Sequence, residues 1–313
     1  MADGSEPRLV IHGGAGSAIR DENRAHSVEE SLRTIRDALY PALVEGDSAE
    51  SVVVEACRRL EDDPLFNAGL GSVLQSDGRA RLSASLMTTD PGRFSAAINA
   101  ERIRHPIELA RVLQDREDAV LSEAGTQRLA RELGMSVFDP VTDRRLANWY
   151  DERRDELAEC DGPEDRSSGG GFGTVGAVAL DREGDLAAAT STGGRGFEYV
   201  GRVSDSAMPA GNYATQHAAV SCTGVGEDIV DECAAARIAI RVADGADLGE
   251  AFEKTFEEAE ERDRQFGGVG IAADGRIAWG RTTDVLLGAW RTPAGRGHTL
   301  DTPVEPTVRA VTG

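Results

Sequence analysis

The feature that most constrains this chain is an abrupt change of character at Thr174. Residues 151–173 are polar and acidic and end in a run of glycines, which is typical of a loop. An apolar strand begins directly after Thr174, and a second strand, residues 186–192, follows a short turn. A threonine at the start of a buried strand, directly behind a long loop, is expected if the chain is cut there and Thr174 becomes a new amino terminus.

The turn between these two strands predicts their register. If residues 182–184 form a three-residue loop with the glycine in the left-handed conformation, Asp181 pairs with Asp185 and Thr174 pairs with Thr192. Side chains alternate along a strand, so Thr174 and Thr192 are expected on the same face of the hairpin.

The glycines around Thr174 also match two nucleotide-binding patterns, which we reject. Gly171, Gly173 and Gly176 have the spacing of a dinucleotide-binding loop, but that loop follows a strand and opens a helix. Adding Val178 completes the glycine-rich loop of protein kinases, which also need a strand lysine and two catalytic tripeptides. The single lysine, Lys254, lies in a helical pattern, and neither tripeptide is found.

Length and composition indicate a chain able to form a large core. The 313 residues, 40% of them hydrophobic, could form one large domain or two small ones. No run approaches the length of a transmembrane helix, and the acidic N-terminal stretch does not resemble a signal peptide. We therefore expect a cytoplasmic protein without a membrane partner.

The net charge argues against a nucleic-acid-binding protein, and the spacing of the cysteines and histidines argues against a transition-metal protein. The net charge of −21 disfavours nucleic acid as a partner, because its phosphates would be repelled. We hypothesise adaptation to a salty cytoplasm, since about 1 M salt shortens the screening length to roughly 3 Å. The four cysteines and five histidines show no metal-ligand spacing, so neither a transition-metal site nor a required cofactor is expected.

Hydrophobic periodicity predicts both helices and strands. A glycine-rich tight turn is expected at 12–17, a packed loop at 60–72, a strand edge and turn at 73–79, and an acidic connector at 138–173 with some helix in 144–157. The predicted strands are 8–11, 82–87, 94–98, 175–180, 186–192, 218–222, 267–273 and 276–280, and the predicted helices are 27–43, 48–60, 106–113, 120–133, 228–242 and 248–262. Helix pairs between antiparallel strands suggest an α+β sandwich with sheets inside and helices outside.

Six short blocks, in order, carry a family resemblance. The chain resembles the plant-type L-asparaginase and isoaspartyl peptidase family of threonine N-terminal nucleophile hydrolases. The matching blocks are Ile11–Gly16, Pro64–Gly69, Gly173–Val178, Thr190–Gly194, Gly201–Ser206 and Thr223–Glu227.

The resemblance implies a fold, a cleavage and an assembly. The implied fold is a four-layer αββα sandwich in a single domain. The chain would cleave itself into residues 1–173, ending in an acidic linker from about 139, and residues 174–313. Two cleaved protomers would form an (αβ)2 dimer that acts on a small-molecule or dipeptide substrate.

The resemblance also assigns the site residues. Thr174 matches the nucleophile and follows the cleavage site at Gly173, while Thr192 matches its supporting hydroxyl. Thr223 and Gly224 match the oxyanion hole. The matching substrate contacts are Arg202, Asp205, Thr223 and Gly226. The backbone carbonyls that would hold a structural Na+ are those of Leu60, Glu61, Asp63, Phe66, Ala68 and Leu70.

Two departures from the family pattern concern serines. Ser204 stands where the family has glycine, between the two clamp residues, and Ser83 replaces an aspartate. Both bear on which substrate is preferred.

The residues themselves support this chemistry. A threonine hydroxyl needs a base, and a free amino terminus on the same residue, with an ordinary pKa of roughly 7.7–8.0, supplies one. Arg202 can bind an α-carboxylate with two parallel bonds, and Asp205 can pair with an α-ammonium.

The expected activity is hydrolysis of the side-chain amide of L-asparagine or of β-aspartyl peptides. The alternatives are a glycosylasparaginase-like hydrolase and an uncleaved, non-catalytic relative that binds amino acids.

Overall fold

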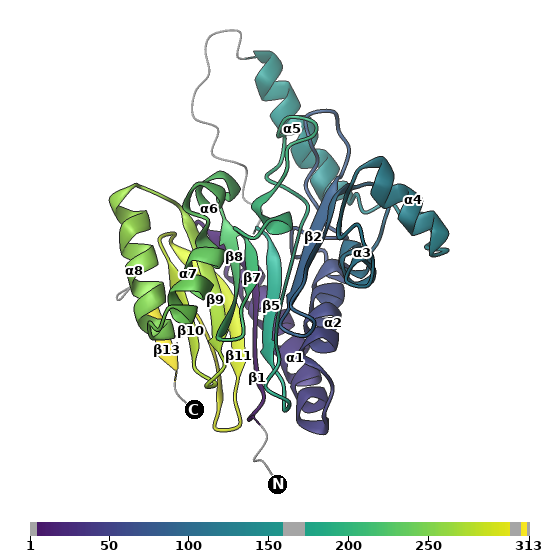
Figure 1. Cartoon of the computed structure of the whole chain (residues 1–313). Helices are drawn as coiled ribbons and strands as arrows, with labels where there is room; N and C mark the ends of the chain where they lie inside the picture. Colours follow the sequence, from purple (N-terminus) through teal and green to yellow (C-terminus); the bar gives the residue numbers. More distant parts are fainter. Residues whose placement is uncertain (1–4, 159–172, 301–307, 312–313) are drawn as a thin grey trace.

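The computed structural model of the chain describes residues 5–158, 173–300 and 308–311 (Figure 1). The last part of the predicted connector, residues 159–172, lies outside the described residues, as does Cys160. Gly173 and Thr174 are described, so both sides of the expected cleavage site can be placed.

Two β-sheets form the centre of the molecule. The eight-stranded sheet has the order β12-β11-β1-β5-β6-β2-β3-β4, and the five-stranded sheet has the order β13-β10-β9-β8-β7. The strands of the larger sheet are β1 (Arg8–Gly16), β2 (Leu82–Thr88), β3 (Phe94–Ala100), β4 (Val120–Ser122), β5 (Val175–Leu180), β6 (Leu186–Thr192), β11 (Val285–Arg291) and β12 (Arg296–His298). Those of the smaller sheet are β7 (Asn212–Ala214), β8 (Ala218–Gly224), β9 (Phe266–Ala272), β10 (Ile277–Arg281) and β13 (Val308–Val311).

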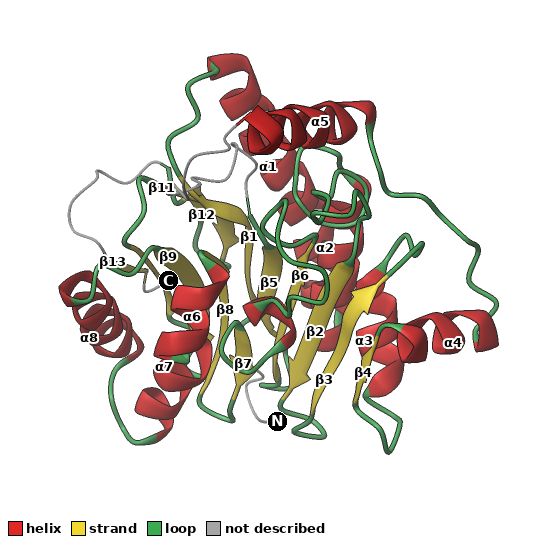
Figure 2. Cartoon of the chain, turned by 90° about the horizontal axis from the view of Figure 1, so that it is seen from above, coloured by secondary structure: helices red, strands yellow, loops and turns green. Residues whose placement is uncertain are grey.

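Helices cover the outer faces of both sheets (Figure 2). Against the larger sheet pack α1 (Glu22–Glu45), α2 (Ala49–Asp62) and α3 (Pro106–Leu113), with α4 (Ala124–Glu132) beside β3. Against the smaller sheet pack α7 (Ala234–Ala243) and α8 (Leu248–Glu261), with α6 (Gly226–Glu232) following β8. The remaining helix, α5 (Asp143–Ala158), lies at the upper end of Figure 1.

The strand period of two divides the apolar residues between two cores. Leu9 and Ile11 of β1 face the helices α1 and α2, whereas Val10 between them belongs to the cluster shared with the second sheet. The same division separates Ala177 from Val178 in β5. Because both faces of β1 and β5 are buried, residues 9–11 and 175–180 are continuous runs without a charged or polar side chain. The α+β class is therefore confirmed.

The hairpin that carries Thr174 has the predicted register. Val175 pairs with Ser191 and Leu180 with Leu186, and the amide of Asp181 donates to the carbonyl of Asp185 at 3.1 Å. Gly184 has φ +88°, as the three-residue loop requires. One residue beyond the Val175–Ser191 pair, Thr174 and Thr192 lie opposite each other at the end of the hairpin.

Several predicted elements need correction at their ends. The first strand does not stop at residue 11, because His12–Gly16 continues along β11 with one irregularity between His12 and Gly14. The tight turn predicted at 12–17 is therefore wrong, although close packing is present: a Cβ on Gly13 would lie 2.4 Å from the Phe66 ring. The first helix begins at Glu22 rather than Ser27, since the Asp21 side chain accepts from the amides of Asn23 and Arg24.

Two predicted helices are divided differently in the structure. Residues 120–122 form strand β4, parallel to β3, and the helix begins only at Ala124. The helix predicted over 228–242 breaks at Cys233, which is left-handed (φ +49°). The next amides, those of Ala235 and Ala236, donate to the carbonyls of Ala210 and Pro209, so contacts with the preceding loop replace helical bonds. Residues 73–79 form a turn without a strand.

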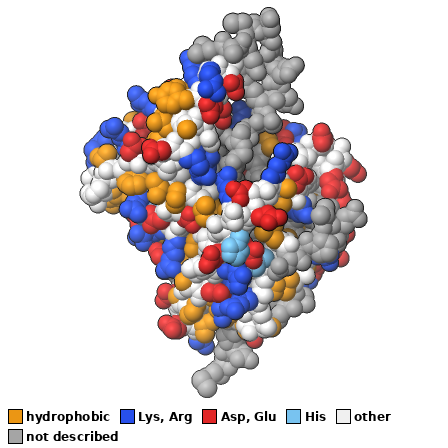
Figure 3. Space-filling view, turned by 180° about the vertical axis from the view of Figure 1, so that it is seen from behind, with side chains coloured by type: hydrophobic (Ala, Val, Ile, Leu, Met, Phe, Trp, Pro, Cys, Tyr) orange, Lys and Arg blue, Asp and Glu red, His pale blue; other side chains and the backbone are white. Residues whose placement is uncertain are grey.

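The surface carries both signs of charge despite the acidic total. Figure 3 shows Lys and Arg side chains interspersed with Asp and Glu over the face drawn. Among the described residues, no helix has the length and apolar character needed to cross a membrane.

Candidate active site

The candidate nucleophile lies where β5 begins. Thr174 is 5% exposed, and its Oγ1 is 3.0 Å from the Oγ of Ser206. Its carbonyl accepts a hydrogen bond of 3.0 Å from the Oγ1 of Thr223. The threonine is therefore held from two sides, by the loop after Arg202 and by the end of β8.

Thr192 ends the neighbouring strand β6 and is 2% exposed. Its Oγ1 accepts from the amide of Gly194 at 3.1 Å, and within the described residues it makes no hydrogen bond to Thr174. Asn67 fastens the same turn: its Nδ2 donates to the carbonyl of Gly194 at 2.7 Å, and its carbonyl accepts from Gly193 at 2.9 Å. Thr192 thus lies at the end of the strand paired with β5, and its hydroxyl is engaged by the Gly194 amide.

Two hydrogen-bond donors face the residue before Thr174. A Cβ added to Gly173 would lie 3.3 Å from the Oγ1 of Thr223 and 3.9 Å from the amide nitrogen of Gly224. Gly224 has φ +137°, and a side chain on it would meet the backbone of Phe266 at 2.6 Å. Only glycine fits there, which fixes its amide next to the Thr223 hydroxyl.

The two clamp residues converge on Gly226. A Cβ on Gly226 would lie 2.6 Å from Nη2 of Arg202 and 2.7 Å from Oδ1 of Asp205. Arg202 donates from Nε and Nη2 to the two carboxylate oxygens of Glu227, at 2.6 and 2.9 Å. This bidentate pair lowers the pKa of the Glu227 carboxyl. The guanidinium fork that would bind a substrate carboxylate is therefore held by an acidic side chain of this chain.

Asp205 is a buried carboxylate with one oxygen available. It is 2% exposed, its Oδ1 accepts from the Oγ of Ser204 at 2.9 Å, and its Oδ2 has no hydrogen-bond partner among the described residues. Burial raises its pKa to about 6, against the opposing effects of Ser204 and Arg202. A buried carboxylate oxygen without a donor is suited to an ammonium group.

A second buried network supports the strands behind Thr174. The Nε2 of His12 lies 2.7 Å from the Oγ of Ser221, which lies 2.8 Å from the Oγ1 of Thr190. Burial lowers the pKa of His12 to about 3, so the imidazole is neutral. A Cβ on Gly176 would lie 2.3 Å from the Ser221 hydroxyl and 2.4 Å from the His12 ring. This network joins β1, β5, β6 and β8 below the site.

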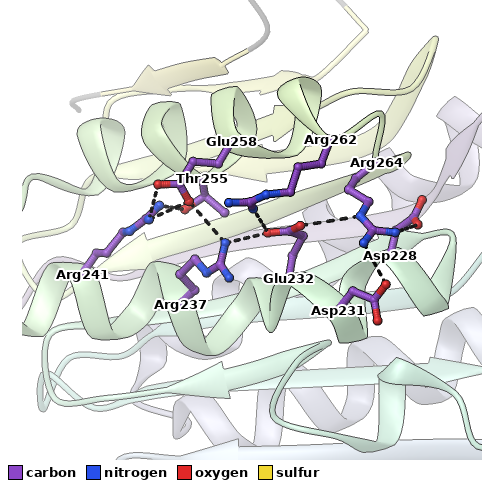
Figure 4. Close-up of polar contacts among 9 residues, drawn as sticks. All are labelled: Asp228, Asp231, Glu232, Arg237, Arg241, Thr255, Glu258, Arg262 and Arg264. Carbon is purple, nitrogen blue, oxygen red and sulfur yellow. Dashed lines mark hydrogen bonds and ion pairs between the residues drawn. The ribbon is translucent and has the colours of Figure 1, made fainter.

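Ion pairs between helices anchor the segment that carries Gly224 and Gly226 (Figure 4). Asp228 accepts from the amide of Gln265 at 2.8 Å and from Arg264 at 3.1 Å, and the carbonyl of Gln265 accepts from Val225 at 2.8 Å. Further along, Glu232 is 2% exposed and pairs with Arg237, Arg262 and Arg264. The network extends to Glu258, which pairs with Arg237 and Arg241.

The loop proposed to hold a cation is compact and rich in backbone oxygen. Inside it, the carbonyls of Leu60, Glu61 and Asp63 accept amide bonds of 3.3, 2.7 and 3.2 Å. Each carbonyl has a second lone pair, and oxygen is the donor type that a hard cation prefers. Of the other residues proposed to supply carbonyls, Phe66 and Ala68 are fully buried and Leu70 is half-buried.

The structure brings Thr174, Thr223, Gly224, Arg202, Asp205 and Gly226 to one end of the sheets, as the sequence predicted. Sequence reasoning assigned no role to Ser206 or Glu227 and treated Ser204 only as a departure that bears on substrate preference, although all three lie within the matching blocks. Ser204 and Ser206 lie in the same short loop as Arg202 and Asp205. This closeness in the sequence could have indicated that the two serines belong to the site.

Comparisons with known proteins agree with this geometry. A family model described as Asparaginase matches residues 5–300, and the chain belongs to this family. An isoaspartyl peptidase/L-asparaginase of Nostoc sp. is 48% identical over 314 residues, covering 98% of each chain. A protein of the same name from Synechocystis sp. is 49% identical, covering 94% of this chain and 91% of its own. An isoaspartyl peptidase of Salmonella typhimurium is 36% identical, covering 94% and 96%.

Proposed function

We propose that this chain cleaves itself between Gly173 and Thr174 and then hydrolyses the side-chain amide of L-asparagine and of β-aspartyl peptides. The observation that carries the proposal is the position of Gly173, against the Thr223 hydroxyl and the Gly224 amide. An oxyanion requires donors of this kind; the Thr223 hydroxyl donates to the Thr174 carbonyl in this structure and has to turn toward the oxyanion as it forms. Losing one such donor typically costs about 2.7–4 kcal/mol of barrier. The names of the relatives support the same chemistry.

After cleavage, Thr174 has both a hydroxyl and a free amine. The amine takes the hydroxyl proton, and the oxygen attacks the substrate carbonyl. The oxyanion that forms accepts from Thr223 and Gly224. Ammonia or a peptide leaves, and water releases aspartate from the acyl-enzyme. Thr192, opposite Thr174, supports the nucleophile.

The substrate's α-groups are held away from the reacting carbonyl. Arg202 binds the α-carboxylate and the carboxylate of Asp205 takes the α-ammonium, with Nη2 of Arg202 and Oδ1 of Asp205 facing the space at Gly226. This pair selects an unblocked aspartyl unit with both a free amine and a free carboxylate. A peptide linked through the β-carboxyl fulfils that condition, as asparagine does.

The remaining features belong to the same proposal. The packing of two sheets between helices supports the four-layer αββα sandwich of N-terminal nucleophile hydrolases. We further propose an (αβ)2 assembly of cleaved protomers, a structural Na+ in the Leu60–Leu70 loop, and a cytoplasmic enzyme adapted to salt. Sizing of the purified protein, and its Tm with Na+ or K+ as the sole cation, test the first two.

The function is tested by assay of purified protein. We expect two fragments, one ending at residue 173 and one beginning at residue 174. We also expect ammonia release from asparagine and aspartate release from a β-aspartyl dipeptide. A glycosylated asparagine is the discriminating substrate: preference for it would make the chain a glycosylasparaginase. A single uncleaved band that still binds aspartate would instead indicate a non-catalytic relative.

A further inference from the structure

Self-cleavage poses a problem that the mature enzyme does not have. Before the Gly173–Thr174 bond breaks, the nitrogen of Thr174 is an amide and cannot accept a proton. The base that serves amide hydrolysis in the proposed function is therefore absent at the first step. Some other group has to take the proton of the Thr174 hydroxyl.

A chain of buried hydroxyl groups leads from Thr174 to a carboxylate. The Oγ1 of Thr174 is 3.0 Å from the Oγ of Ser206, which is 3.3 Å from the Oγ of Ser204. The Oγ of Ser204 is 2.9 Å from Oδ1 of Asp205. All four residues are at most 5% exposed, so water does not compete freely for these contacts.

Local structure holds the chain of hydroxyls in place. Ser204 caps the 3-10 helix Asp205–Ala207, and its side chain accepts from the amide of Ser206. The carbonyl of Ser206 accepts from the Oγ of Ser85 at 2.6 Å, and Ser85 in turn accepts from Nδ2 of Asn212 at 2.9 Å. The backbone of Ser206 is thereby held against β2 and β7, and the Ser204 side chain is held by the cap.

The surroundings of Asp205 make it a suitable base. Arg202 faces it with a positive charge, Glu227 with a negative one, and the thiol of Cys222 lies close by. Burial raises the pKa of that thiol well above its usual value, so it stays neutral. Arg202 is already paired with Glu227, which leaves the Asp205 carboxylate incompletely neutralised. With its pKa raised to about 6, mainly by burial, it is ionised at pH 7 yet more basic than an ordinary aspartate.

We propose that Asp205 is the general base of self-cleavage, reached from Thr174 through the hydroxyl groups of Ser206 and Ser204. As the Thr174 oxygen bonds to the Gly173 carbonyl carbon, its proton passes to Ser206, that of Ser206 to Ser204, and that of Ser204 to Asp205. The C–N bond then breaks, and the proton returns along the same chain to the leaving amine. Water hydrolyses the resulting ester, which gives the Gly173 carboxylate and restores the Thr174 hydroxyl.

Asp205 consequently serves twice. In the precursor it accepts a proton through Oδ1, and in the mature enzyme its carboxylate pairs with the substrate ammonium. Ser204 is the residue that connects the two roles, and a glycine at this position would break the chain of hydroxyls.

The test is the rate of self-cleavage in the full-length chain. Precursor is refolded at pH 5, where Asp205 is protonated, and moved to higher pH while the intact 33.2 kDa band is followed on denaturing gels. Cleavage of the unaltered chain should accelerate as the pH rises through about 6. Ser204→Ala should slow cleavage at pH 7 by about 10²–10⁴-fold, the usual range for general acid–base catalysis. Ser204→Thr, which keeps a hydroxyl, should restore most of the rate.

Controls separate this inference from loss of folding and from the proposed function. Ser95→Ala removes a hydroxyl that is equally buried and donates to the carbonyl of Ala110, and it should cleave at the normal rate. Circular dichroism melts show whether each variant is folded. If Ser204→Ala is folded and cleaves at the unaltered rate with the same pH dependence, the relay is refuted. If the unaltered chain never cleaves, the proposed function falls instead.

Discussion

The space left by Gly226 offers the sharpest test of substrate binding. A Cβ there would lie 2.6 Å from Nη2 of Arg202 and 2.7 Å from Oδ1 of Asp205, closer than real Cβ contacts come. Gly226→Ala therefore has to push the two clamp groups apart. Asp205 is buried and cannot move freely, so Arg202, whose side chain is 12% exposed, is the group expected to shift.

The expected magnitude follows from the contact that is lost. A hydrogen bond to a charged group contributes about 1.5–3 kcal/mol, which corresponds to a KM for asparagine raised about 10- to 150-fold. The change in kcat should be much smaller, because Thr174 and the oxyanion donors are not touched. Kinetics are measured as ammonia release, normalised to the amount of cleaved protein.

The matched control is Gly295→Ala. A Cβ at Gly295 meets nothing within 4 Å, so the same substitution should leave KM unchanged. The reasoning is refuted if Gly226→Ala has the KM of the unaltered enzyme, or if its loss appears in kcat alone.

Three further predictions concern charge. Glu227→Gln should lower KM for asparagine several-fold, because the substrate carboxylate then does not have to displace a charged carboxylate from Arg202. An unchanged or raised KM in steady-state assays would count against this. Glu232→Gln should destabilise the fold by about 1–2 kcal/mol in urea titrations, less than the roughly 3–5 kcal/mol of a fully buried pair, since its arginine partners are 29–48% exposed; an unchanged midpoint would contradict the network's role. The net charge of −21 predicts a higher Tm in about 1 M KCl than in dilute buffer, because the screening length falls to roughly 3 Å; equal Tm values would remove the basis for salt adaptation.

Element boundaries and strand register could be predicted from the sequence where a single local feature, such as a turn glycine or a helix-starting proline, determines them. The hairpin around Thr174 could be aligned to the residue from a three-residue glycine loop and the strand period of two; a bulge would have shifted the register by one, and the described pairs of β5 with β6 show none. Helix α3 has the predicted ends, since Pro106 fixes its first turn. Asp21 is also a typical N-cap residue, but the sequence predicts the start of the first helix at residue 27, because the apolar stripe begins only there.

Other features depend on contacts between distant segments. The break at Cys233 arises because the first amides of α7 bond to residues 209 and 210, which no local pattern records. Strand β4 is formed by pairing with β3, and its three residues would suit a helix equally well. The three strands after residue 281 were not predicted at all.

The candidate site shows the same limit. Motif positions singled out the residues that we propose contact the substrate, because their types suit the chemistry. The roles of Ser206, Ser204 and Glu227 depend on how one loop folds back on Thr174 and on α6. Side-chain distances of 2.6–3.3 Å are not encoded in spacing along the chain.

The central claim is that Thr174 becomes reactive when its own amine is set free. Amino-terminal sequencing of the smaller fragment of purified, aged protein tests this most directly. The account predicts that the fragment begins Thr-Val-Gly-Ala and that amidohydrolase activity appears in step with it. Full activity in a chain that remains intact, or a fragment beginning at any other residue, would contradict it.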